Sequence, residues 1–254
     1  MAGRSAAKTI RLDALLAERG LAESRTKAQA MILAGEVWVD GKPVTKAGAR
    51  VAAGARLELR STRLRFASRG GEKLAGALED FRLPVEGKVC LDIGASTGGF
   101  TDCLLQRGAA RVYAVDVTTS QLAWKLRQDA RVIPVEKNAR YLSAQDIPEP
   151  VELVTVDVSF ISVTKLLPAL VSLARPGTEF LILVKPQFEL ERGAVGRGGI
   201  VREPELQARA IERVRRAAEA AGLEVCGVVP SRLAGAEGNQ EFFLRARRKP
   251  ADSR

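Results

Sequence analysis

Histidine is absent from all 254 residues of the chain. Without imidazole the chain cannot build a Ser-His-Asp triad or the usual site of a zinc hydrolase. The three cysteines, Cys90, Cys103 and Cys226, are far apart and follow no metal-ligand spacing. We therefore expect no bound metal, and we interpret the cysteines as small buried residues in a reducing compartment.

Long apolar runs are also missing. No stretch approaches the roughly 18 uninterrupted apolar residues of a membrane helix, and the first residues lack the apolar core of a signal peptide. We expect a cytoplasmic protein with no membrane segment. This pattern also disfavours a pore-forming protein, which would need an apolar or amphipathic membrane segment.

Acidic residues are fewer than basic ones, 30 against 40, which gives a formal net charge of +10. The excess is uneven, because residues 1–66 carry 13 Lys/Arg and 6 Asp/Glu, a net of +7 in a quarter of the chain. Scattered positive charge usually serves solubility. Positive charge concentrated in one segment favours a polyanionic partner, so we expect nucleic acid.

The first sixty residues predict a very small α+β module. Residues 10–19 show apolar side chains at helical spacing, and Ser24 is placed to cap a second short helix. Residues 37–44 contain an Asp-Gly pair between two β-prone runs, the strongest short signal for a hairpin. A last strand is expected over residues 56–60.

This segment resembles the S4-like RNA-binding domain. The resemblance covers roughly residues 9–60 and rests on three motifs: Arg11-Leu12-Asp13-x-x-Leu16, Ser24-Arg25-x-x-Ala28 and Gly35-x-Val37-x-Val39-x-Gly41. It implies a module that grips structured RNA through phosphate and shape contacts. The basic residues near the helix starts and the hairpin are the candidate RNA contacts, with an ordinary solvated surface as the alternative: Arg11, Arg25, Lys27, Lys42 and Lys46.

Past Phe66 strand-like and helix-like segments alternate, which predicts an α/β domain with a doubly wound, Rossmann-like parallel sheet. We expect an RNA-binding domain over residues 9–62, a linker over 63–68 and the larger domain over 69–249. The larger domain should therefore hold its ligands at the carboxyl edge of the sheet.

A glycine-rich turn follows the first strand of this domain, residues 89–94, and the second strand ends in Asp116. A dinucleotide could bind such a turn, with the acid on a ribose hydroxyl. Asp92 argues against that, because a carboxylate beside the turn repels a pyrophosphate but suits the ammonium of a methionine moiety. The pattern favours S-adenosylmethionine, with tight turning alone as the alternative, and gives these candidate cofactor residues: Asp92, Gly94, Ala95, Ser96, Thr97, Gly98, Gly99, Phe100 and Asp116.

Charged residues lie at several other element ends. Asp157 closes the fourth strand, Lys185 closes the fifth, Glu241 opens the last strand, and Lys73 precedes the first helix of the domain. The Asn-Pro-Pro-aromatic motif of amino methyltransferases and the Pro-Cys pair of pyrimidine carbon-five enzymes are both absent.

Three motifs resemble the TlyA (haemolysin A) family: residues 94–100, Val184-Lys185-Pro186-Gln187-Phe188-Glu189, and the Ser-Arg-Gly-Gly-Glu-Lys run at residues 68–73. The resemblance covers roughly residues 9–247. These enzymes are ribosomal RNA cytidine-2′-O-methyltransferases related to the FtsJ/RrmJ ribose methyltransferases.

The resemblance implies a class I methyltransferase with a mostly parallel seven-stranded sheet, S-adenosylmethionine as cofactor and ribosomal RNA or a ribosomal subunit as partner. It also implies a monomer off the ribosome that modifies the large subunit, with the small subunit left open. The Lys-Asp-Lys-Glu tetrad carries over to Lys73, Asp157, Lys185 and Glu241. Lys185 either accepts the proton of the ribose hydroxyl or stays charged and stabilises the alkoxide. Asp157 is also a candidate cofactor contact.

Two departures affect the adenosine side of the site. The run Glu136-Lys137-Asn138-Ala139-Arg140 is one residue shorter than the family pattern, so adenine contacts from Glu136 or Asn138 are candidates only. Thr118-Thr119 replaces a glycine-containing turn after Asp116.

Other functions remain open on the sequence alone. An RNA-binding assembly factor with a vestigial methyltransferase fold would share the composition. A pseudouridine synthase would share the RNA module, but Asp92 and Gly94 speak against its fold.

Overall fold

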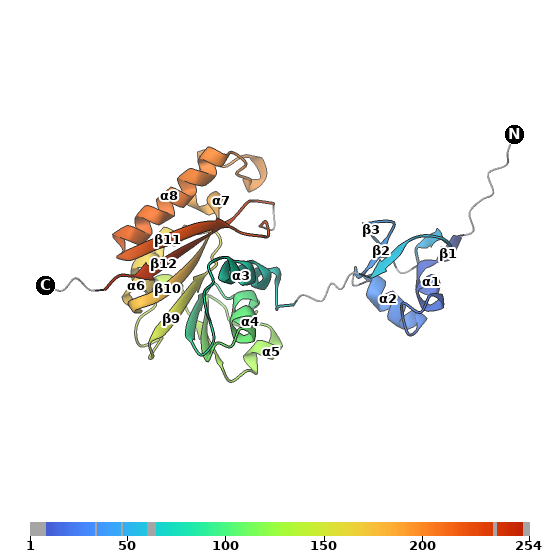
Figure 1. Cartoon of the computed structure of the whole chain (residues 1–254), viewed down its shortest axis with the longest axis horizontal. Helices are drawn as coiled ribbons and strands as arrows, with labels where there is room; N and C mark the ends of the chain where they lie inside the picture. The colour runs from blue at the N-terminus through green and yellow to red at the C-terminus, as the bar shows by residue number, and fades with distance from the viewer. Residues whose placement is uncertain (1–8, 34, 47, 60–64, 236–237, 251–254) are drawn as a thin grey trace. The chain divides into compact units, whose positions relative to one another are not determined.

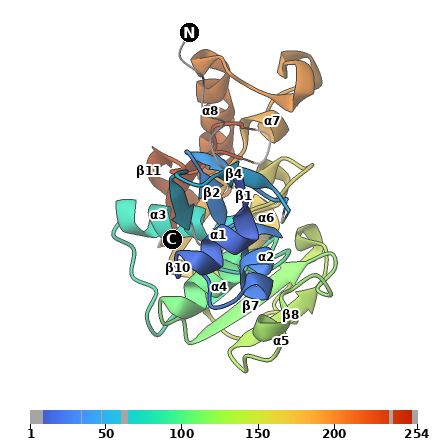
Figure 2. The same ribbon diagram turned by 90° about the vertical axis from the view of Figure 1, so that its right-hand side faces the viewer.

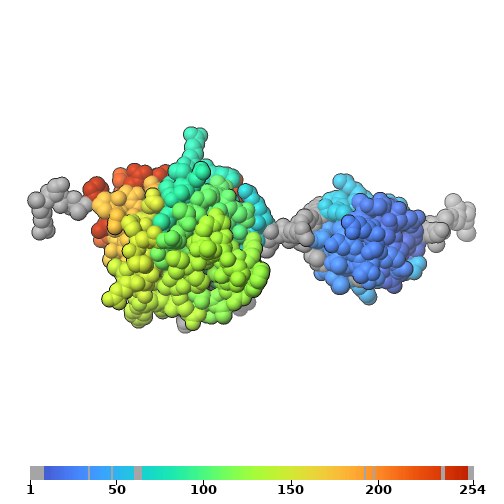
Figure 3. All heavy atoms as spheres, turned by 90° about the horizontal axis from the view of Figure 1, so that it is seen from below, coloured from blue at the N-terminus to red at the C-terminus, as the bar shows by residue number. Residues whose placement is uncertain are grey.

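The computed structural model describes residues 9–33, 35–46, 48–59, 65–235 and 238–250. The chain divides into two compact units between Leu64 and Arg65 (Figure 1). Each unit has its own buried hydrophobic core. Figure 3 draws the heavy atoms of both units as spheres. Of the residues expected in the linker, Phe66 packs in the core of the second unit and Ser68 caps its first helix.

Over its described residues, the first unit is a small α+β module of two helices and five short strands. The predicted hairpin is confirmed in β2 (Val37–Val39) and β3 (Lys42–Pro43), which pair antiparallel. Asp40 and Gly41 at its turn both have positive φ, at 48° and 80°, as a two-residue turn of type I′ requires. The elements are β1 (Thr9–Arg11), α1 (Leu12–Glu18), α2 (Arg25–Leu33), β2 (Val37–Val39), β3 (Lys42–Pro43), β4 (Arg50–Ala52) and β5 (Leu57–Leu59).

One prediction in this unit is wrong. The apolar spacing predicts Ile10 and Arg11 in the first helix, but they lie in β1, which pairs antiparallel with β4. Ile10 lies opposite Val51 in this pairing. The strand β4 carries no recognisable alternation in its three residues, so its partner could not be inferred from sequence.

The second unit contains the expected mostly parallel sheet. Its seven strands lie in the order β11-β12-β10-β9-β6-β7-β8, and β12 runs antiparallel to both of its neighbours. The strands are β6 (Val89–Ile93), β7 (Arg111–Asp116), β8 (Val132–Glu136), β9 (Val151–Val156), β10 (Ala174–Val184), β11 (Leu223–Pro230) and β12 (Phe242–Arg248). The Rossmann-like fold class is therefore confirmed.

Helices cover both faces of this sheet (Figure 1, Figure 2). The helices are α3 (Arg69–Asp80), α4 (Gly99–Gln106), α5 (Trp124–Arg127), α6 (Leu167–Ser172), α7 (Pro186–Glu189) and α8 (Pro204–Ala220). Successive strand residues point to opposite faces, so Leu181 and Leu183 join the core under α3, α4 and α5, whereas Phe180 and Ile182 join the core under α6 and α8. Short 3₁₀ turns are η1 (Ala139–Tyr141), η2 (Val163–Lys165), η3 (Arg192–Ala194) and η4 (Arg197–Gly199).

Lys73 is predicted ahead of the first helix of this unit, and the structure corrects this placement. Helix α3 begins at Arg69, because Ser68 adopts an extended N-cap conformation and its Oγ accepts a hydrogen bond from the Gly70 N–H at 3.3 Å. Two early glycines obscured the helix in the sequence. Gly71 is needed there, since a Cβ would lie 2.3 Å from the Cβ of Phe66.

The cysteines are all free, and two of the three fit their interpretation. Cys90 and Cys103 are buried, and burial raises the pKa of each thiol to about 12. Cys226 is exposed on β11, so its predicted burial is wrong. Among the described residues, no helix combines the length and the apolar character that crossing a membrane requires.

Candidate active site

The turn between β6 and α4 passes unusually close to the end of β9. Gly94 has φ at +83°, and a Cβ there would lie 2.1 Å from the carbonyl oxygen of Asp157. Gly98, at φ +92°, forms the N-cap of α4, and a Cβ there would lie 2.1 Å from the side chain of Leu126. Only glycine fits both places, so the glycines are required by close packing as well as by the turn.

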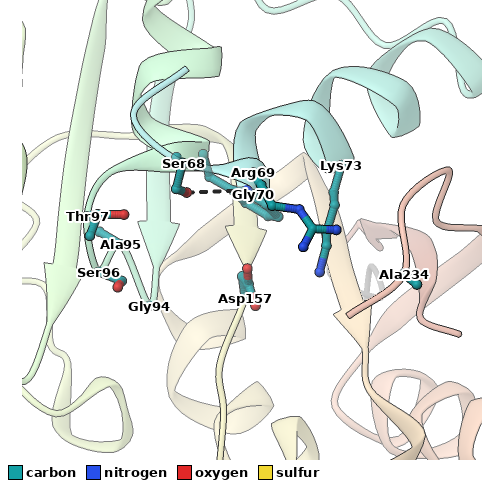
Figure 4. Close-up of a pocket in the computed structure, with 12 residues that line it drawn as sticks. Ser68, Arg69, Gly70, Lys73, Gly94, Ala95, Ser96, Thr97, Asp157 and Ala234 are labelled. Atoms are coloured by element: carbon teal, nitrogen blue, oxygen red, sulfur yellow. Dashed lines mark hydrogen bonds between the residues drawn. The ribbon is translucent and has the colours of Figure 1, made fainter. Parts of the chain in front are cut away.

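Two adjoining cavities lie on either side of this turn. The first is lined by residues from the start of α3, the turn, and the segments after β9 and β11: Ser68, Arg69, Gly70, Lys73, Gly94, Ala95, Ser96, Thr97, Gly99, Phe100, Asp157 and Ala234 (Figure 4). The second has an apolar and polar lining that includes Asp116, Val117, Asn138, Ser159 and Phe160. Gly94, Ser96 and Asp157 line both cavities.

The four tetrad residues form two ion pairs at this end of the sheet. Lys185 Nζ lies 2.5 Å from Asp157 Oδ1 and donates a hydrogen bond to Ser159 Oγ at 2.9 Å. Lys73 Nζ donates to Glu241 Oε2 at 2.5 Å. All four side chains are largely buried, and Figure 4 shows Lys73 and Asp157 facing the first cavity from different elements.

The sheet explains how residues so distant in sequence meet. Asp157 follows β9 and Lys185 follows β10, which run parallel and end at the same edge. Glu241 directly precedes β12, and because β12 is antiparallel to β10 its start lies at that same edge, with Phe242 opposite Val184. The charged residues at these three strand ends therefore lie together at one edge of the sheet.

Asp157 belongs both to an ion pair and to the cavity walls. Its Oδ1 is buried and lies 2.5 Å from Lys185 Nζ, so this oxygen is occupied by the ion pair. Asp157 also lines both cavities, which places the ion pair at the point where the two cavities adjoin.

Asp92 lies beneath the turn and lines neither cavity. It is fully buried, and its carboxylate accepts hydrogen bonds from Thr101 Oγ1 at 2.7 Å and Thr155 Oγ1 at 3.0 Å. Burial raises the pKa of Asp92 to about 7. The structure thus places this carboxyl where it ties α4 to β9, not on a cavity wall beside an ammonium.

Asp116 lies at the end of β7 and lines the second cavity. Its carboxylate accepts hydrogen bonds from the backbone N–H groups of Ser96 at 2.9 Å and Thr118 at 3.3 Å. It therefore fixes the turn and also faces the cavity, as expected for a residue that holds a ribose.

The adenosine side differs from the expectation in one residue. Glu136 does not line the second cavity. Its carboxylate accepts hydrogen bonds from the backbone N–H and the hydroxyl of Thr119, and these bonds lower the pKa of Glu136. This carboxylate holds the turn that lacks the usual glycine. Asn138 lines the cavity, and so does Lys137, which sequence reasoning missed although it adjoins both candidates.

Other cavity residues were also missed. Ser68, Arg69 and Gly70 line the first cavity, and their place in a family motif beside Lys73 was the available signal. Phe160 lines the second cavity with 93% of its surface exposed and φ at +66°. No sequence pattern distinguishes such an exposed aromatic from a core residue.

In the first unit the five candidate RNA contacts fall into two groups. Arg11 and Arg25 both contact the buried carboxylate of Asp13, Arg11 through two hydrogen bonds at 3.0 and 2.8 Å. These hydrogen bonds hold the pKa of Asp13 well below its usual range, and those from Arg11 have the largest effect. Lys27, Lys42 and Lys46 are exposed.

Comparison with known proteins matches both units. Residues 66–248 match the family model of FtsJ-like methyltransferases, and residues 10–57 match that of the S4 domain. The 16S/23S rRNA (cytidine-2′-O)-methyltransferase TlyA of Mycobacterium tuberculosis is 48% identical over 94% of this chain and 90% of its own length.

The chain belongs to the TlyA family of FtsJ-like methyltransferases. Hemolysin A of Brachyspira hyodysenteriae is 42% identical over 92% of this chain and 98% of its own length. A solved structure from Streptococcus thermophilus that carries a hemolysin name is 42% identical, with a TM-score of 0.74 over 98% of this chain and 92% of that one. The family resemblance is confirmed, and the S4 domain indicates an RNA partner.

S-adenosylmethionine is the cofactor of this methyltransferase. The residues present fit it. Gly94 leaves space where a side chain would collide, Asp116 faces the second cavity, and Asp157 lines both cavities. The individual contacts predicted from sequence remain predictions.

Substituting Gly94 with alanine should weaken cofactor binding strongly. The new Cβ would collide with the Asp157 carbonyl at 2.1 Å, and the turn would have to move out of the cavity wall. Gly177→Ala is the matched control, because Gly177 also has positive φ, at +87°, but has nothing within 4 Å of its Cβ position. Calorimetry with S-adenosylhomocysteine should show a loss of at least about tenfold in affinity for Gly94→Ala alone; equal affinities in both variants would contradict this role of the turn.

Proposed function

We propose that this protein transfers a methyl group from S-adenosylmethionine to the 2′-hydroxyl of a cytidine ribose in ribosomal RNA. The observation that carries the proposal is the pair of buried ion pairs, Lys185–Asp157 and Lys73–Glu241, beside the glycine turn. The name of the Mycobacterium tuberculosis relative states this reaction on 16S and 23S rRNA. We propose the large subunit as substrate, with the small subunit as a second one.

Methyl transfer requires the ribose hydroxyl to be positioned and its proton to be removed. Bound S-adenosylmethionine supplies a methyl group already activated on a sulfonium sulfur. A ribose hydroxyl is a poor nucleophile, so the protein must align it with the methyl group and manage its proton. In this proposal Asp116 and the turn hold the cofactor, and Lys185 meets the hydroxyl oxygen.

Asp157 and Ser159 set the direction of the Lys185 amine through contacts at 2.5 and 2.9 Å. Two roles fit this geometry. As a free amine Lys185 accepts the hydroxyl proton, and as an ammonium it stabilises the developing alkoxide. Lys73 is held by Glu241 and adds positive charge to the wall of the first cavity.

The proposal extends to the rest of the molecule. The exposed lysines of the first unit contact RNA phosphates, whereas Arg11 and Arg25 contact both Asp13 and RNA. The enzyme works in the cytosol as a monomer off the ribosome. It needs no metal, since the sulfonium already activates the transferred group.

Replacing Lys185 tests the catalytic assignment. Lys185→Ala should lower kcat by about 100-fold or more, because a positioned acid or base typically contributes a factor of this size to the rate. The affinities for the cofactor and for RNA should stay within about threefold of wild type. If Lys185 accepts the proton, Lys185→Arg should also lose methyl transfer, because a guanidinium stays charged at any working pH and cannot accept a proton. Methyl incorporation into ribosomal RNA and calorimetry measure the two effects.

The pH profile separates the two roles. A lysine that must lose its proton first gives a rate that rises with pH, whereas a carboxylate base gives a plateau from mildly acidic pH upward. A flat profile with an active Lys185→Arg variant would make Lys185 a fixed charge and transfer the base role to Asp157. Wild-type protein that binds the cofactor but methylates no ribosomal RNA would favour an assembly factor.

The lysines of the first unit are expected to give RNA binding its salt dependence. Lys42→Gln with Lys46→Gln should lower the slope of log affinity against log salt by about 0.7 to 0.9 for each phosphate that is no longer neutralised. Lys165→Gln with Lys249→Gln, two exposed lysines of the second unit, is the matched control. Equal slopes in both double variants would show that the first unit does not supply these contacts.

A further inference from the structure

Two segments meet at the catalytic lysine. The first follows β9 and is called here the acceptor loop, residues 157–163, which carries Asp157, Ser159 and Phe160. The second contains Lys185 and the short helix α7 (Pro186–Glu189), directly after β10. The proposed chemistry uses only Lys185 of the second segment, although the motif Pro186-Gln187-Phe188-Glu189 follows it without a gap.

The second segment holds the acceptor loop at three successive points. At the beginning of the loop Lys185 contacts Asp157 and Ser159. In the middle the Phe188 ring lies 5.4 Å from that of Phe160, at an angle of 52°. The third contact, at the end of the loop, comes from Glu189.

Glu189 makes the most buried of these contacts. Its carboxylate accepts a hydrogen bond from Ser162 Oγ at 2.5 Å and one from the Val163 backbone N–H at 2.8 Å, and only 2% of its surface is exposed. A carboxyl group buried to this extent needs its hydrogen bonds, and removal of the acceptor would leave the Val163 N–H unpaired. Burial also raises the pKa of Glu189.

Glu189 is itself fixed from the other side. Arg213 on α8 donates a hydrogen bond to the backbone carbonyl of Glu189 at 2.9 Å. The loop that Glu189 holds contains Phe160, an aromatic residue at φ +66°. Such a backbone conformation persists only where the surrounding structure enforces it, so the loop depends on its anchors.

We propose that Glu189 is a positioning residue for methyl transfer, which fixes the end of the acceptor loop so that Asp157 and Ser159 hold Lys185 in its reactive orientation. Glu189 lines neither cavity and touches no substrate in this assignment. It acts through Ser162 and Val163 on the loop. The inference rests on the function proposed above.

The test compares Glu189→Ala with Glu189→Gln in the full-length protein. Glu189→Ala should lower kcat by about tenfold to a hundredfold, as expected for a misplacement on the order of 1 Å near the chemistry, while the KM for ribosomal RNA stays within about twofold. Glu189→Gln should recover most of kcat, because its amide oxygen can still accept from Val163 and its amide nitrogen can donate to Ser162 Oγ.

Glu179→Ala is the matched control for general destabilisation. Glu179 is also a buried glutamate, but its carboxylate binds Arg245 and Arg247 at the sheet instead of the acceptor loop. It should lower the melting temperature and leave kcat per folded molecule unchanged. If Glu189→Ala and Glu179→Ala lose activity only in proportion to folded protein, the positioning role is wrong.

A second readout is independent of the acceptor RNA. Hydrogen exchange measured by mass spectrometry should accelerate across residues 157–163 in Glu189→Ala and remain slow in Glu179→Ala and Glu189→Gln. Slow exchange in Glu189→Ala, or a raised KM with unchanged kcat, would overturn the inference. Faster exchange together with a wild-type protein that methylates no ribosomal RNA would instead refute the proposed function and leave the loop anchor established.

Discussion

The close contact between Gly94 and the backbone of Asp157 is the constraint on which the rest of the site depends. The strands β6 and β9 are neighbours in the sheet, so the turn after β6 and the segment after β9 leave the same edge side by side. A glycine at residue 94 lets the turn lie against the Asp157 carbonyl. Asp157 lines both cavities, so the close contact places the proposed catalytic charges beside the proposed cofactor turn.

Two layers of polar contacts are built on this arrangement. The inner layer consists of the ion pairs Lys185–Asp157 and Lys73–Glu241, in which each largely buried charge lies against an opposite one. The outer layer contains carboxylates that hold backbone or side-chain groups of the protein instead of facing a cavity. Asp92 ties α4 to β9, Glu136 holds the turn after β7, and Glu189 holds the acceptor loop.

The sequence was sufficient for the fold class, the family and the charged residues of the site, for physical reasons. Alternating buried strands and helices predict a parallel sheet, and such sheets collect strand-end residues at one edge. Lys73 and Glu241 lie 168 positions apart, yet both could be named because each belongs to a recognisable motif or strand end.

What the sequence could not reveal is which partner each carboxylate takes. Asp92 and Glu136 are both predicted at the cofactor, but hydrogen bonds from the side chains of Thr101 and Thr119 turn them toward the protein. Arg11 is a predicted RNA contact, and the structure shows it also bound to Asp13. Such choices depend on side-chain directions and on local backbone positions, which no residue spacing encodes.

The chemical position of the transferred methyl group tests the proposed reaction most directly. Ribosomal RNA lacking the modification would be incubated with the protein and S-adenosylmethionine carrying a deuterated methyl group, then digested and analysed by mass spectrometry. We expect the label on the ribose 2′-oxygen of a cytidine, and we expect it to be lost with Lys185→Ala. Label on a base, or label that persists undiminished in Lys185→Ala, would contradict the proposed reaction.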